Sequence, residues 1–83
     1  MTIEKIKELV DPWLEKNGCK SIVANVICGT YEVLDMTTNE KVIFHKDHVE
    51  VIPSGYTALL NPDFESEILD KLYDTIYDLG IYD

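Results

Sequence analysis

The chain contains no arginine and no glutamine, and its seven basic residues are all lysines. Without arginine it lacks the planar guanidinium groups that bind phosphate through two parallel hydrogen bonds and that nucleic-acid-binding proteins favour. Its 16 acidic residues give a formal net charge of −9, and such a charge repels nucleic acid and attracts basic surfaces. The sequence therefore argues against direct nucleic-acid binding and for a protein partner with a basic surface.

Other features are also scarce. The four glycines are isolated, so no glycine-rich loop is present to hold a phosphate. Apolar runs are too short to cross a bilayer. The N-terminus lacks the basic segment followed by an apolar segment that is typical of a signal peptide. We therefore expect a cytoplasmic protein that does not contact membranes. Its two cysteines are then expected to be reduced, with no disulfide framework.

A chain of 83 residues suits one domain, and a hydrophobic content of 46% is ordinary for a globular protein. Near the N-terminus, apolar residues recur every three or four positions from Ile3 to Leu14, which predicts a helix capped by Thr2. Pro12 should kink this helix or restart it with Asp11 as the new cap. Gly18 should end it in the left-handed conformation.

From residue 21 the apolar period changes to that of strands, with segments at 22–27, 31–35, 41–45 and 48–51. The links between them are too short for crossovers, so an antiparallel meander is expected. Asn61 and Pro62 then form a helix-start signal, and Gly80 should end this second helix. The predicted fold is one small α+β domain over residues 1–83, in the order α-β-β-β-β-α, with both helices on one face of the sheet.

The last third of the chain holds seven acidic residues against the single base Lys71. Helical neighbours three or four residues apart lie about 5–6 Å from each other and repel when both are charged. This spacing resembles that of successive phosphates on a nucleic-acid strand. We predict a partner-binding surface of carboxylates, with one tyrosine as an anchor: Asp63, Glu67, Asp70, Asp74, Tyr77 and Asp78.

Four side chains of the kind that bind zinc are present: Cys19, Cys28, His45 and His48. The cysteines are nine positions apart, whereas structural zinc sites bring their ligands in tight pairs, so we predict no metal site and no cofactor. No serine lies in a nucleophile turn, and no two carboxylates are marked as an acid–base pair. We therefore expect a protein that is not an enzyme.

The leading hypothesis is a small acidic binding protein that inhibits a basic, nucleic-acid-binding host protein. A composition rich in residues with AT-rich codons points to a low-GC bacterium or one of its phages or mobile elements. The alternative hypothesis is an assembly module that forms a homodimer or larger homo-oligomer through its sheet edge or a helix stripe. A third hypothesis is a zinc-stabilised domain, which a chelator would unfold.

Overall fold

The structure is a computed structural model that describes residues 2–58 and 61–82, with the backbone alone from residue 55 to residue 63. It begins with helix α1 (Ile3–Asn17), followed by strands β1 (Ile22–Ile27), β2 (Thr30–Asp35), β3 (Glu40–Phe44) and β4 (Val49–Ile52). Two short strands, β5 (Gly55–Ala58) and β6 (Asn61–Asp63), precede helix α2 (Glu67–Thr75). The predicted order of helix, four strands and helix is confirmed.

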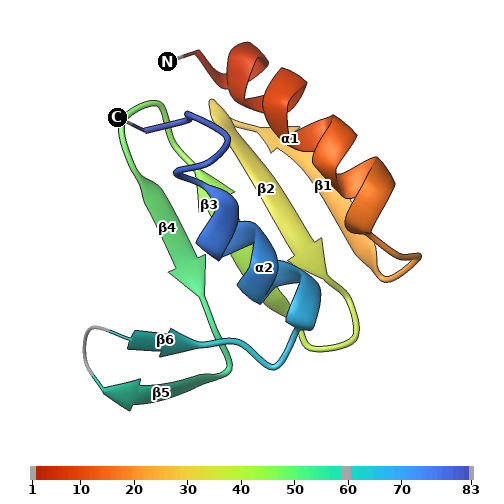
Figure 1. The fold of residues 1–83 in the computed structure, drawn as a ribbon, viewed down its shortest axis with the longest axis vertical. Coiled ribbons are helices and arrows are strands. Elements are labelled where there is room, and N and C mark those ends of the chain that lie inside the picture. The colour runs from red at the N-terminus through yellow and green to blue at the C-terminus, as the bar shows by residue number, and fades with distance from the viewer. Residues whose placement is uncertain (1, 59–60, 83) are drawn as a thin grey trace.

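Strands β1 to β4 form one antiparallel sheet in sequence order. Figure 1 shows α1 and α2 side by side across one face of this sheet, with the β5–β6 hairpin projecting beyond one end. The core lies between the helices and the sheet. It is built from Ile6 and Val10 of α1, Leu69 and Leu72 of α2, and alternate residues of β2 and β3, which include Val33 and Phe44.

Helix α1 begins as predicted, with the Thr2 hydroxyl accepting the N–H of Lys5. It continues through Pro12 as one element, so of the two predicted outcomes, a kink or a restart at Asp11, the restart is wrong. Asp11 does not cap a new helix. Its carboxylate accepts hydrogen bonds from Lys7 and from the hydroxyl of Tyr31, which ties the helix to β2.

Gly18 ends α1, but not by the predicted left-handed conformation. Its φ of −79° and ψ of 174° are extended. A Cβ atom at this position would lie 2.5 Å from the carbonyl oxygen of Leu14. Glycine is needed here because the chain passes close to the last turn of the helix.

The predicted start of the second helix is also wrong. Asn61 and Pro62 lie in β6, opposite Ala58 and Tyr56 of β5, and α2 begins after its cap Ser66, whose hydroxyl accepts the N–H of Leu69. At its other end α2 stops at Thr75 and the chain continues as turns. Gly80, the predicted stop, has a positive φ of 72° at the end of these turns.

A buried carboxylate sets the position of α2. Glu40, which is 1% exposed, accepts the backbone N–H groups of Ser54, Glu65 and Ser66 at 2.8, 2.9 and 2.8 Å. Burial by itself raises the pKa of Glu40, but these three donors outweigh it and lower the pKa to about 2. Glu40 thereby holds the chain on both sides of the β5–β6 hairpin and fixes where the helix begins.

Candidate partner-binding site

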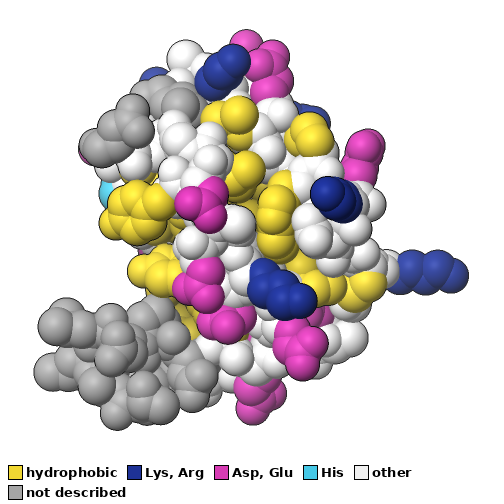
Figure 2. Space-filling model, viewed as in Figure 1, with side chains coloured by type: hydrophobic (Ala, Val, Ile, Leu, Met, Phe, Trp, Pro, Cys, Tyr) yellow, Lys and Arg dark blue, Asp and Glu magenta, His cyan; other side chains and the backbone are white. Residues whose placement is uncertain are grey.

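Helix α2 separates its apolar and acidic residues cleanly. Leu69 and Leu72 are buried in the core, whereas Glu67, Asp70 and Asp74 are exposed. Asp78, in the turn that follows, is exposed as well. We call these four residues the acidic surface: Glu67, Asp70, Asp74 and Asp78. In Figure 2 acidic side chains follow the line of α2 on the face turned to the viewer.

Helix α2 carries three acidic residues, Glu67, Asp70 and Asp74, and one base, Lys71. Among the described residues, no ion pair joins Glu67, Asp74 or Asp78 to a base. The last turn of α2 contains no basic residue and does contain Asp74. A negative charge there interacts unfavourably with the helix dipole and lowers the stability of the helix by about 0.3–1 kcal/mol. The placement of Asp74 therefore lowers the stability of the helix, whereas Glu67 and Asp70 lie in its first turn, where negative charge is favourable.

The structure places the six predicted residues in three different settings. Glu67, Asp70 and Asp74 lie on α2. Tyr77 and Asp78 lie in the turns beyond its end, so the row of helically spaced acids is shorter than predicted. Asp63 belongs to β6, away from the helix it was expected to start, and its side chain lies outside the described residues.

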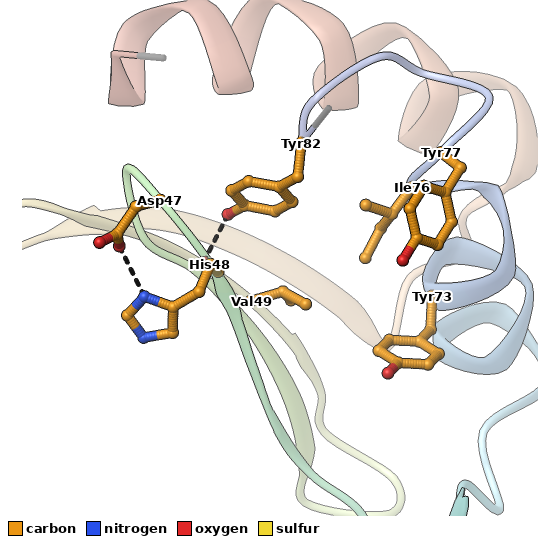
Figure 3. Close-up of a pocket in the computed structure, with 7 residues that line it drawn as sticks. All are labelled: Asp47, His48, Val49, Tyr73, Ile76, Tyr77 and Tyr82. Atoms are coloured by element: carbon orange, nitrogen blue, oxygen red, sulfur yellow. Dashed lines mark hydrogen bonds and ion pairs between the residues drawn. The ribbon is translucent and has the colours of Figure 1, made fainter.

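A cavity of about 300 Å³ lies between the C-terminal end of α2 and the start of β4. Figure 3 shows Tyr73, Ile76 and Tyr77 on one side of it and Val49 on the other, with the ring of Tyr82 reaching across. The lining is mostly apolar and aromatic. Tyr77 is 83% exposed, so its ring is available to a partner at the mouth. We call this the tyrosine cavity.

One hydrogen-bonding group fixes the upper wall of the tyrosine cavity. The hydroxyl of Tyr82 lies 2.6 Å from the carbonyl oxygens of both His45 and His48 and donates its proton to them. Burial, together with the nearby carboxylate of Asp47, raises the pKa of Tyr82 to about 12. Tyr82 therefore stays neutral at physiological pH and holds the C-terminal segment against the β3–β4 turn.

The histidines come together at the same turn. Their rings stack with centroids 4.2 Å apart, and each has a carboxylate partner, Glu50 for His45 and Asp47 for His48. Cys19 precedes β1 and Cys28 lies in the β1–β2 turn, and both are exposed. Within the described part of the chain, no three histidine, cysteine or acidic side chains are arranged to hold a metal ion.

The chemistry of this region suits a cation with an apolar stem. Tyrosine rings attract a lysine or arginine head group placed over their faces, and the carboxylates outside the cavity add a long-range attraction. The sequence pattern indicated the acids and Tyr77. It did not indicate the cavity, because Val49 and Tyr82 reach it only through the tertiary fold.

No helix in the described residues is long and apolar enough to cross a membrane. Comparisons with protein-family models, with curated proteins and with solved structures each found no match. Any proposal about function must therefore come from the residues themselves.

Proposed function

We propose that this chain is a small acidic binding protein, without enzymatic activity, that presents its acidic surface to a basic partner protein. The observation that carries the proposal is the pairing of two features at one end of α2. Asp74 and Asp78, which join no ion pair among the described residues, directly follow Tyr73 and Tyr77 of the tyrosine cavity, whose volume is about 300 Å³. Either feature alone is common on acidic proteins, but together they match both the charge and the shape of a lysine or arginine side chain.

The two features contribute different parts of the binding. Exposed carboxylates steer a basic partner toward the surface and accelerate encounter, and this effect weakens as salt screens it. The tyrosine cavity supplies a place where a side chain is desolvated, which is where binding energy concentrates in protein interfaces. Tyr77, exposed at the mouth, would close over an inserted side chain.

The proposed partner class is a nucleic-acid-binding protein whose cationic groove the acidic surface occupies, so that the chain acts as an inhibitor. Glu67, Asp70 and Asp74 supply negative charges at helical spacing, about 5–6 Å, close to the spacing of successive phosphates on a single strand. A phage or mobile-element origin in a low-GC bacterium remains our hypothesis from the composition.

The test is an affinity capture from lysate of a low-GC bacterium with paired variants of the immobilised protein. Asp74→Asn with Asp78→Asn removes two charges from the acidic surface. Glu4→Gln with Glu8→Gln removes two exposed charges from α1 and serves as the matched control. We expect a nucleic-acid-handling protein that elutes with rising salt, is lost with the first pair and is kept with the second.

Two results would contradict this proposal. Equal loss of the partner with both variant pairs would mean that only net charge matters. Recovery of nothing but the protein itself, with a melting temperature that rises with concentration and ignores salt, would favour the homo-oligomeric assembly module.

A further inference from the structure

The outer edge of β1 carries backbone groups that no other strand in the described residues uses. β1 ends the strand order, so only β2 pairs with it. The N–H of Met36 bonds to the carbonyl of Ser21 in this hairpin. Bonded and non-bonded pairs alternate along an antiparallel ladder, so the odd-numbered residues of β1 bond to β2. The N–H and C=O groups of Ala24 and Val26 therefore point outward.

This edge lacks the usual protections of an exposed strand. Proteins guard free edges with charged residues, prolines or bulges. β1 reads Ile-Val-Ala-Asn-Val-Ile without any of these, and Val26 is 53% exposed. The opposite edge strand, β4, contains the exposed Glu50 and is followed by Pro53. The β1 edge is thus the one suited to accept a further strand.

A second cavity, of about 270 Å³, lies beside this edge between α1 and β1. We call it the α1–β1 cavity. Its apolar lining includes Leu14 and Ile22, and the small side chain of Ala24 leaves it open. Small-molecule sites usually measure about 300–1,000 Å³, so this space is better matched to a single side chain.

The α1–β1 cavity has acidic groups in its lining, Asp11 and Glu15. Asp11 already accepts hydrogen bonds from Lys7 and Tyr31. Glu15 is exposed and joins no ion pair among the described residues. Lys16 and Lys20 do not line the cavity. An incoming side chain with an apolar stem and a positive head would therefore match the space.

The edge and the cavity are in register. A residue that pairs with Ala24 across the free edge projects its side chain to the same face as the side chain of Ala24. That face is the one on which the cavity lies, because Ala24 and Ile22 line it. The residue two positions earlier in an antiparallel strand would lie opposite Val26, whose exposed apolar side chain can cover it.

From this geometry we propose that the β1 edge binds an extended peptide segment as a fifth antiparallel strand, with a lysine or arginine opposite Ala24 inserted into the α1–β1 cavity. Main-chain bonds supply affinity and the side-chain pocket supplies selectivity, as in other strand-addition complexes. This surface is separate from the acidic surface, so the inference does not depend on the function proposed above.

A second copy of the chain fits this edge less well. Continuous antiparallel pairing of two β1 edges requires a two-fold axis perpendicular to the sheet, which brings both α1 helices to the same face. Glu15 of each copy would then approach the other across the axis. The protein carries a net charge of −9, so self-association is opposed locally and overall.

The test uses the full chain labelled with ¹⁵N and the synthetic peptide acetyl-Thr-Val-Thr-Lys-Thr-amide. We expect amide shifts at Ala24, Val26, Leu14 and Glu15, and slower hydrogen exchange at Ala24 and Val26. N-methylation of the peptide lysine amide removes one main-chain bond and should weaken binding about tenfold. Replacing that lysine by glutamate should weaken it further.

A variant of the protein separates strand addition from charge attraction. Val26→Pro removes an outward N–H without breaking the ladder to β2, since proline is tolerated on a free edge. It should reduce peptide binding about tenfold, while Glu65→Gln, at an exposed position outside both proposed surfaces, leaves peptide binding unchanged. The inference is overturned if shifts map to α2 alone, if the N-methylated peptide binds equally, or if no shift occurs at millimolar peptide. It is also overturned if sedimentation shows a dimer whose Ala24 and Val26 amides are already protected.

Discussion

At the N-terminal end of α2 a buried carboxylate and a buried hydroxyl accept backbone N–H groups, whereas at the C-terminal end the charged groups face solvent. Glu40 accepts three backbone N–H groups there, and the buried Ser66 caps the helix. Beyond Thr75, Asp78 and the ring of Tyr77 are exposed. One helix therefore has one end that anchors it and one end that displays charge.

The contrast shows how similar chemical groups serve stability in one place and recognition in another. A buried carboxylate with three donors cannot be removed without leaving N–H groups unsatisfied. A solvated carboxylate at the wrong end of a helix dipole can be removed with no loss to the fold. Substitutions at the two ends should therefore separate folding from binding.

The largest effect is expected for Glu40→Gln. The amide offers one acceptor oxygen in place of two and turns an NH₂ group toward a backbone donor, so we expect a loss of about 3 kcal/mol in the free energy of unfolding. Urea denaturation measures this loss. Glu65→Gln removes the same charge from an exposed neighbour and should change stability by less than about 0.5 kcal/mol. Equal effects of the two substitutions would disprove the anchoring role of Glu40.

Acid should reproduce part of this loss. Because the folded pKa of Glu40 is lowered from 4.5 to about 2, the unfolded chain binds a proton more readily at intermediate pH. The ionised Glu40 contributes up to about 3 kcal/mol to the free energy of unfolding. This contribution is complete above about pH 4.5 and is lost as the pH falls toward 2. Asp35 and Asp11, whose pKa values are also lowered, add to the same trend.

The measurement is the free energy of unfolding from pH 7 to pH 2 for the wild type and for Glu40→Gln. The variant should show a much shallower decline, since only the other carboxylates remain to titrate. Parallel curves for the two proteins would show that Glu40 does not carry the acid sensitivity.

A smaller effect is expected for Ser66→Ala, which removes the cap of α2. The hydroxyl accepts the N–H of Leu69 at 3.2 Å, and such caps contribute about 1 kcal/mol. Ser66→Thr retains an acceptor and should recover most of the loss. Ser54→Ala, at an exposed position, is the matched control, and thermal melts compare the three. A melting temperature of Ser66→Ala equal to that of the control would contradict the capping role.

These residues also show why the start of α2 was predicted wrongly. Asn61 and Pro62 have the right local chemistry for a helix start, but the helix begins where Glu40 binds the N–H groups of Glu65 and Ser66. That contact spans at least 25 residues, and no local pattern reveals it. Strands β1 to β4 were predictable because their alternation is local, and the Thr2 cap was predictable for the same reason, whereas β5 and β6 were not predicted.

In the candidate site, too, the features set by local sequence were predictable and those set by long-range contacts were not. The exposure of Asp70 and Asp74 follows from helical period alone, so the acidic surface on α2 was visible in the sequence. The tyrosine cavity was not, because it depends on Tyr82 meeting the β3–β4 turn, a contact across 34 to 37 residues. The free edge of β1 likewise becomes visible only when the strand order is known.

The smallest effect on stability, and the sharpest test of the contrast, is expected for Asp74→Asn with Asp78→Asn. Removing negative charge from the C-terminal end of α2 relieves its conflict with the helix dipole, so stability should stay unchanged or rise by a few tenths of a kcal/mol. Urea denaturation at low salt measures this change, and Glu4→Gln with Glu8→Gln should act in the opposite direction, because Glu4 lies in the first turn of α1 and Glu8 pairs with Lys5. A loss above about 1 kcal/mol for Asp74→Asn with Asp78→Asn would mean that these carboxylates hold the fold together. Unchanged or higher stability together with lost partner binding would show that this end of α2 is kept acidic for recognition, because the fold gains nothing from it.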